Sequence, residues 1–224
     1  MPKLQTAAFT ASLVFAALTS QSTVSAQHTV NIPASGGWLV VGKITPPGGS
    51  TRQWAGFEPS GGGRCSWWLL GESAGLSDDV VVNGSSGADR VLVLENNMTF
   101  CGQNMAPVTF NGHDVGIQGW GGNDIIGGRA AWMSGGSGHD YLAGSDGTTT
   151  TLWGWTGNDK MWGGSGASMY GESGLDALCS IGTSTASLFN GGSDWGGDDV
   201  GCGSANSWVG IESSNPSFCP LPCL

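Results

Sequence analysis

Short apolar stretches alternate with glycine-rich polar stretches over the central part of the chain. An apolar residue lies two positions after the aspartate in each of the six copies, and another lies seven positions before it in the first five. The earlier residues are Val82, Ile117, Met133, Leu152 and Met169, and the later ones are Val91, Ile126, Leu142, Met161, Leu178 and Val200. Apolar residues on both sides of a polar turn allow two short strands to point into a shared core. The pattern predicts pairs of short β-strands joined by tight turns.

The turns share a motif in which the aspartate follows glycines placed two and five positions earlier. The six copies read GSSGAD, GWGGND, GGSGHD, GWTGND, GESGLD and SDWGGD, and they end at Asp89, Asp124, Asp140, Asp159, Asp176 and Asp198. In the last copy Ser193 replaces the first glycine, and an insertion around residues 190–192 displaces the preceding apolar residue to Leu188. Copies in one register indicate a repeated structural unit.

The spacing of the aspartates predicts the architecture. Successive aspartates are 35, 16, 19, 17 and 22 residues apart. A repeat this short cannot enclose a core alone, whereas stacked copies can. We therefore expect an all-β fold, a right-handed parallel β-solenoid or β-roll with irregular capping segments at both ends. The gap of 35 is close to two periods, so we expect one coil without the loop near residues 101–107, which would isolate Asp89.

The motif resembles the calcium-binding repeat of the repeats-in-toxin family, G-G-x-G-x-D-x-U-x, where U is a large apolar residue. The stretch GGSGHDYLA at residues 135–143 fits this pattern in full, and the resemblance covers about residues 80–202. The family implies a parallel β-roll with Ca²⁺ held between successive loops. Here the opposite turns, such as GGRAA and SDGTTTT, lack the motif, so one column of ions is expected. The one-sided layout is also similar to calcium-bound solenoid segments of large bacterial adhesins, including an ice-binding one.

The residue types in the loop also suit calcium directly. Ca²⁺ takes six to eight oxygen ligands, many of them backbone carbonyls, and glycine lets a loop turn its carbonyls inward. Carboxylates in adjacent strands, about 4.8 Å apart, repel by roughly 1 kcal/mol in water and roughly 3.5 kcal/mol at an effective dielectric of 20. A column of them therefore needs cations. The expected metal ligands are Asp89, Asp124, Asp140, Asp159, Asp176 and Asp198, and the loops from Asp124 to Asp198 leave room for about four ions.

A simpler interpretation of the aspartates stays open. Aspartate beside glycine is common in turns because its side chain accepts hydrogen bonds from nearby backbone N–H groups. The overall charge favours cations, because 17 acidic residues outnumber 7 basic ones and the formal net charge is −10. The same balance argues against a nucleic-acid partner, which would need clustered lysine and arginine.

The tryptophans suggest an alternative function. The chain has 11 of them, and Trp120 and Trp155 share the second position of their loops. Exposed aromatic rings could bind glycans or cell-surface material, whereas buried ones would cover the thin core and the sheet edges. Ice binding would need a regular array of threonines, and the Thr148–Thr151 run does not recur.

An enzymatic function finds little support in the sequence. The three histidines are His28, His113 and His139. None belongs to a recognisable set of nucleophile, base and orienting acid, and the repeated carboxylates are better explained by metal. We therefore expect a binding protein and not an enzyme.

Features near the two ends predict export and disulfides. Lys3, the apolar run 7–18 and the small residues 24–26 indicate a cleaved signal peptide over residues 1–26. All six cysteines follow it, and an even count in an exported chain predicts disulfides, with 15 pairings possible. We expect a secreted or cell-surface monomer without a transmembrane anchor. Residues 27–79 would form an N-terminal β-rich cap, 80–202 the calcium-binding repeats and 203–224 a cysteine-rich C-terminal cap.

Overall fold

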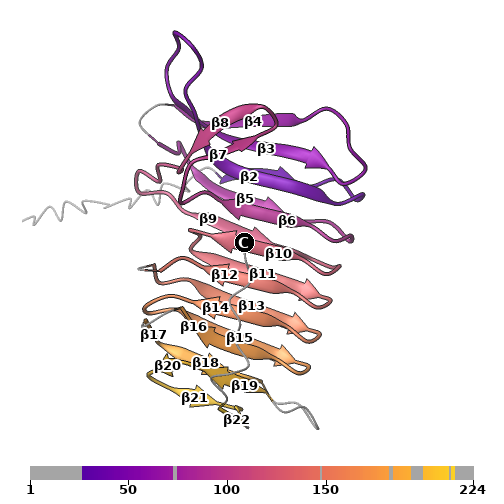
Figure 1. Cartoon of the computed structure of the whole chain (residues 1–224), viewed down its shortest axis with the longest axis vertical. Helices are drawn as coiled ribbons and strands as arrows, with labels where there is room; N and C mark the ends of the chain where they lie inside the picture. Colours follow the sequence, from indigo (N-terminus) through magenta and orange to yellow (C-terminus); the bar gives the residue numbers. More distant parts are fainter. Residues whose placement is uncertain are drawn as a thin grey trace, which may run out of the picture.

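The computed structural model of the chain is all-β. It describes residues 27–72, 75–146, 148–181, 184–192, 199–211 and 213–214, which form 22 strands and no helix. The all-β class and the parallel sheets predicted from the sequence are confirmed (Figure 1). Because these ranges contain no helix, they include none long and apolar enough to cross a membrane. The predicted signal peptide, residues 1–26, lies outside the described residues.

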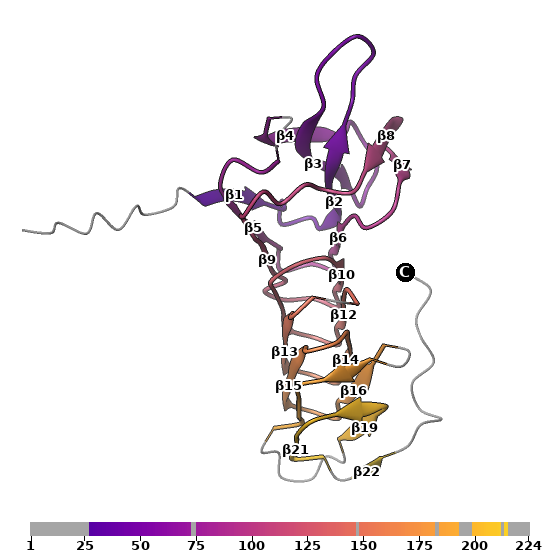
Figure 2. The ribbon, with the colours of Figure 1, turned by 90° about the vertical axis from the view of Figure 1, so that its left-hand side faces the viewer.

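Two large sheets contain most of the strands. The eight-stranded sheet, here sheet A, has the order β1 (Gln27–Asn31), β5 (Asp79–Asn83), β9 (Val115–Gln118), β11 (Trp132–Ser137), β13 (Thr151–Thr156), β15 (Ser168–Ser173), β18 (Leu188–Asn190) and β21 (Trp208–Val209). All of its pairings are parallel. Figure 2 shows its strands stacked along the long axis of the molecule, facing those of the second sheet.

The twelve-stranded sheet, here sheet B, contains a parallel and an antiparallel part. Its parallel part is β22 (Ser213–Ser214), β19 (Val200–Cys202), β16 (Ala177–Ser180), β14 (Lys160–Gly163), β12 (Tyr141–Gly144), β10 (Ile125–Gly128), β6 (Arg90–Val93) and β2 (Gly37–Ile44). Its antiparallel part adds β3 (Arg52–Pro59), β4 (Ser66–Gly71), β7 (Met98–Phe100) and β8 (Gln103–Ala106). A separate two-stranded sheet pairs β17 (Thr185–Ala186) with β20 (Ser204–Ala205).

From β9 to β16 the chain alternates between the sheets, and we call each sheet A strand with the following sheet B strand a layer. Equivalent residues of adjacent layers are in register; Met133, for example, pairs with Leu152, which pairs with Met169. Pleating sends alternate side chains to opposite faces, so one apolar residue per strand is enough to fill the space between the sheets. The first five pairs of flanking apolar residues predicted from the sequence are all at most 1% exposed and belong to one core cluster.

The sixth copy departs from the predicted register by one residue. Phe189, and not Leu188, pairs with Met169 and is fully buried. On the other side of the loop, Gly201 pairs with Leu178, while Val200 is half-buried against a cluster on the outer face of sheet B. A shift of one residue moves a side chain to the opposite face of a sheet. The predictions that Leu188 and Val200 flank this loop in the core were therefore wrong.

The coil without a loop predicted between Asp89 and Asp124 does not exist. Strands β5 and β6 pair directly with β9 and β10, so the two aspartates lie in adjacent layers. The extra residues leave the stack as the antiparallel pair β7–β8, and β8 returns to pair with β2. The length of the gap therefore reflects an excursion and not a missing copy.

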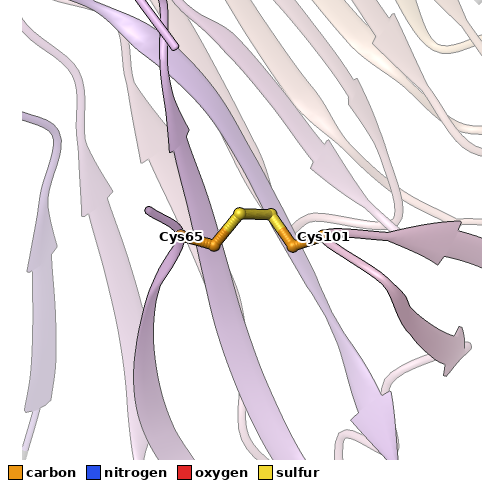
Figure 3. The surroundings of a disulfide bond; sticks show 2 residues. All are labelled: Cys65 and Cys101. Atoms are coloured by element: carbon orange, nitrogen blue, oxygen red, sulfur yellow. A yellow bond between two sulfur atoms is a disulfide. The ribbon is translucent and has the colours of Figure 1, made fainter. Parts of the chain in front are cut away.

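The N-terminal segment is more regular than predicted. Strands β1 and β2 continue the parallel parts of sheets A and B, and only β3 and β4 form an antiparallel extension. A disulfide joins Cys65, just before β4, to Cys101, between β7 and β8 (Figure 3). This disulfide therefore links the β3–β4 extension to the β7–β8 pair. Cys179 and Cys202, register neighbours on β16 and β19, also take part in disulfides.

Candidate metal site

The aspartates of the motif occupy equivalent positions in the stack. Each loop leads from a sheet A strand to the next sheet B strand, and the aspartate is the residue immediately before that second strand. This holds for Asp89, Asp124, Asp140, Asp159 and Asp176, and also for Asp199. Asp198, the residue predicted from the sequence, lies outside the described residues, and Asp199 has the register position before β19. The column thus contains five of the predicted residues together with Asp199.

One oxygen of each carboxyl group accepts a hydrogen bond from the preceding layer. The backbone N–H of Asp124 donates to Oδ1 of Asp140 at 2.7 Å, and that of Asp140 donates to Oδ1 of Asp159 at 2.7 Å. The same bond joins Asp89 to Asp124, Asp159 to Asp176 and Asp176 to Asp199, each at 2.8 Å. At the N-terminal end Gly37 donates to Asp89 at 3.1 Å. We call this series the aspartate ladder.

The second carboxyl oxygen points into its own loop. A Cβ atom on the first glycine of the motif would overlap this oxygen. For example, a Cβ on Gly119 would overlap Oδ2 of Asp124, and one on Gly135 would overlap Oδ2 of Asp140. The first glycine therefore leaves the space that the carboxyl group fills. Oδ2 of Asp124, Asp140 and Asp159 is buried and has no hydrogen-bond partner. Asp89 differs, because its Oδ2 accepts a hydrogen bond from the backbone N–H of Ser85 at 2.6 Å.

Glycine backbone packs closely between successive loops. Gly122, Gly138 and Gly157, each two residues before an aspartate, have φ values of 104°, 134° and 130°, which favour glycine. A side chain on Gly138 would overlap the carbonyl oxygen of Gly122, and one on Gly157 would overlap that of Gly138. At the first glycine of the motif, a side chain on Gly119 would overlap both Oδ2 of Asp124 and the carbonyl oxygen of Gly135, so a carbonyl group of the next loop lies beside the buried carboxyl group.

Burial sets the protonation of the carboxyl groups. It raises the pKa of Asp124 from 3.8 to about 8, that of Asp159 to about 7 and that of Asp140 to about 6. The hydrogen bond from the preceding layer lowers each pKa but does not offset the loss of solvation. Negative charge on Asp140 and Asp89 further raises the pKa of Asp124. Burial also raises the pKa of Asp89. Without a cation, Asp124 therefore holds a proton at neutral pH, Asp159 is about half protonated there, and Asp140 is mostly ionised.

A second ladder lies on the exposed side of the loops, one residue before each of the aspartates from Asp124 to Asp176. The N–H of His139 donates to Oδ1 of Asn123 at 2.9 Å, and the N–H of Asn158 donates to Nδ1 of His139 at 2.8 Å. Leu175 N–H donates in turn to Asn158 at 3.0 Å. This ladder runs opposite to the aspartate ladder, because each layer here donates to the preceding one. Nothing in the repeat motif indicates it, since these positions are variable in type.

The donor set limits how a metal could bind. Within the described ranges there is no group of three or more histidine, cysteine, aspartate or glutamate side chains that could hold a metal ion. A cation in these loops would therefore take most of its ligands from backbone carbonyls, with the carboxyl groups as a minority. Calcium accepts such a set, whereas protein zinc sites are built from side chains, chiefly histidine and cysteine. The buried oxygens without a partner and the close-packed glycine backbone fit calcium.

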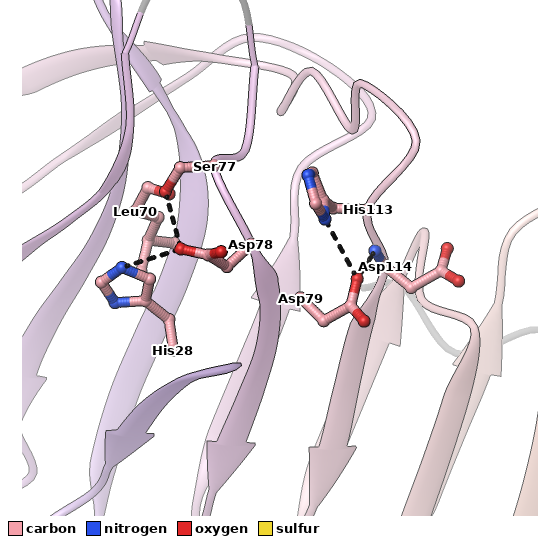
Figure 4. A network of polar contacts seen from close by, with 7 residues as sticks. All are labelled: His28, Leu70, Ser77, Asp78, Asp79, His113 and Asp114. Carbon is pink, nitrogen blue, oxygen red and sulfur yellow. Dashed lines mark hydrogen bonds and ion pairs between the residues drawn. The ribbon is translucent and has the colours of Figure 1, made fainter. Parts of the chain in front are cut away.

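The two remaining histidines lie away from the aspartate column, by the first strands of sheet A. Figure 4 shows His28 paired with Asp78 at 3.8 Å and His113 paired with Asp79 at 3.3 Å. Ser77 donates a hydrogen bond to Asp78, so the carboxyl group lies between the hydroxyl and the imidazole. That order differs from a nucleophilic triad, in which the imidazole contacts the hydroxyl.

Comparison of the chain with protein-family models, with curated proteins and with solved structures gave no match.

Proposed function

We propose that this chain is a secreted calcium-binding protein of the repeats-in-toxin type, a right-handed parallel β-solenoid whose loops hold a column of Ca²⁺ ions. The observation that carries the proposal is the buried, unpartnered Oδ2 of Asp124, Asp140 and Asp159. A buried charged oxygen without a partner is unfavourable, and it requires either a proton or a cation. Calcium would supply that cation.

The neighbouring residues would prepare each carboxyl group for the ion. The hydrogen bond on Oδ1 fixes the orientation of the side chain, as between Asp124 and Asp140 at 2.7 Å. This leaves Oδ2 as the oxygen available to metal, beside a glycine carbonyl of the adjacent loop. The bound ion would neutralise two neighbouring carboxylates and join their layers. The six aspartates of the ladder leave five such gaps, one more than the sequence predicted, because Asp89 adjoins Asp124.

The alternative function for the aspartates, capping alone, explains only half of the geometry. The ladder bonds are what capping predicts for Oδ1. Capping gives no role to Oδ2 of Asp124, Asp140 and Asp159, and an asparagine would cap equally well without a buried charge. Six aspartates in one column therefore favour a charged ligand.

The location forms part of the proposal. A disulfide such as Cys65–Cys101 persists in oxidising compartments, which supports export. Calcium sites built largely from backbone oxygens suit the high calcium concentrations outside cells, because they need few charged ligands.

The test is thermal unfolding of residues 27–224 in millimolar calcium and after calcium removal with EGTA, at about pH 8 where the carboxyl groups ionise. We expect a higher melting temperature in calcium, because an ion that binds only the folded state stabilises it by mass action. Magnesium at the same concentration is the matched control. Equal melting temperatures in calcium and EGTA would refute the proposed function.

A further inference from the structure

Two tryptophans on the loop side of the stack are exposed in spite of their size. Trp120 is 56% exposed and Trp155 is 51% exposed. Trp208 is the one other exposed tryptophan in the described part of the chain, and its ring packs edge-on against Phe189 at 4.7 Å. A large indole usually buries most of its surface, so two solvent-facing ones on one edge indicate a contact surface.

The backbone at these two positions is strained. Trp120 has φ 75° and Trp155 has φ 76°, in the left-handed region that bulky residues rarely adopt. Gly136 occupies the same loop position in the layer between them, with φ 108°. The loop therefore accepts glycine here, and each tryptophan adds strain of about 1–2 kcal/mol. Glu172, at the same position in the next layer, has φ 74°, so the loop imposes this conformation on the residue there. Strained backbone is enriched at functional sites, which supports a role for the two tryptophans.

The spacing of the two indoles is fixed by the layers. Gly136 pairs in register with Trp155 on the next strand, and a side chain on Gly136 would overlap the carbonyl of Trp120. The three residues are thus consecutive steps along the stack. Two steps of about 4.8 Å place the tryptophans about 9.6 Å apart, and the glycine leaves no side chain between them.

Polar groups accompany the rings. The exposed hydroxyls of Ser137 and Thr156 lie in the same loops, next to Gly136 and Trp155. Trp153, two residues before Trp155 on β13, stacks on Tyr170 of β15 with ring centroids 6.0 Å apart. Both rings of this pair are half-buried. Aromatic faces beside hydroxyls suit a sugar, which presents C–H groups on its faces and hydroxyls at its edge.

We propose that Trp120 and Trp155 bind a β-1,4-linked polysaccharide chain laid along the stack. Such a chain in its extended form turns the same ring face outward at every second sugar, a repeat close to two layer spacings. Each indole would stack on one of those alternate sugars, and the sugar between them would pass over Gly136. The site goes beyond calcium binding, and different side chains carry it.

The experiment measures depletion of the folded protein, in millimolar calcium, from solution by insoluble cellulose, chitin or starch. We expect binding to cellulose, to chitin or to both, and the two arms identify the sugar. Starch has α-1,4 links and a coiled chain, so it should not bind. Trp120→Gly and Trp155→Gly should each weaken binding roughly tenfold, the loss expected for one stacking contact. Glycine relieves the backbone strain, so these variants should melt no lower than the parent chain.

Leu175→Ala is the matched control, because Leu175 is 51% exposed on the same side but is not aromatic. It should bind like the parent chain. Equal binding by the glycine variants, stronger binding to starch, or no binding to either β-linked polysaccharide would overturn the proposal. Calcium titration of the Trp120→Gly, Trp155→Gly double variant tests the proposed calcium sites separately and should match the parent chain.

Discussion

At the scale of single residues, the two oxygens of each aspartate have different surroundings. Oδ1 accepts a backbone hydrogen bond from the adjacent layer, and Oδ2 of Asp124, Asp140 and Asp159 has no partner. The first fact is structural and applies equally to an asparagine, whereas the second applies only to a group that can carry charge. Substitutions that separate these two roles are therefore informative.

Replacing Asp140 by asparagine should separate them. In Asp140→Asn the amide oxygen can still accept from the N–H of Asp124, while the buried charge is lost. Without calcium we expect the variant to be at least as stable as the parent chain, because the buried acid at this position is gone. In calcium it should gain less stability than the parent. Melting curves with and without calcium measure both effects, and an unchanged calcium gain would show that Asp140 is not a ligand.

At the scale of the elements, the loops depend on glycines that leave space for neighbouring groups. Gly138 combines φ 134° with a position against the carbonyl oxygen of Gly122. The motif predicted this loop correctly, because glycine spacing is local information. It selected Asp198 for the column, whereas the structure places Asp199 there. Each of the two follows a glycine by two residues, and only pairing with β16 selects Asp199.

Alanine at Gly138 should lower the free energy of unfolding by at least about 2 kcal/mol, because strain at this φ adds to a clash with backbone. Gly61→Ala is the control, since a side chain there meets no atom within 4 Å. It should change stability by less than about 0.5 kcal/mol. Urea unfolding measures both values. A Gly138→Ala variant as stable as Gly61→Ala would contradict the close packing of adjacent loops.

At the scale of the whole molecule, the periodic residues predicted the stack but not its interruptions. Apolar residues that recur once per strand, such as Met133 and Leu152, identify inward positions wherever the chain stays in the stack. The excursions β3–β4 and β7–β8 leave it and return, and spacing cannot distinguish such an excursion from a missing copy. The ladders and the exposed indoles also depend on neighbouring layers, so sequence alone could not place them.

The pH dependence of stability belongs to the whole column. The folded protein raises the pKa of Asp124 to about 8, of Asp159 to about 7 and of Asp140 to about 6, from 3.8. It therefore binds protons that the unfolded chain releases, and metal-free stability should fall as the pH rises from about 4 to about 8. Melting temperatures of calcium-free protein across this range measure the slope. Asp124→Asn should flatten it, and a melting temperature that rises toward pH 8 would contradict the raised pKa values.

Calcium should reverse this loss, because the ion replaces the proton on each buried carboxyl group. The stabilisation by calcium is then largest at about pH 8 and smallest at about pH 5. The same exchange predicts proton release on binding, which calorimetry in buffers of different ionisation enthalpy would detect.

The most direct measurement is the number of calcium ions bound per folded chain, by equilibrium dialysis at about pH 8. The column of six aspartates predicts several ions, up to the five gaps between adjacent loops, and fewer in Asp140→Asn, which alters the gaps on both sides of that residue. A folded chain that binds no calcium at millimolar concentration would contradict the account, and the aspartates would then serve only to cap the backbone.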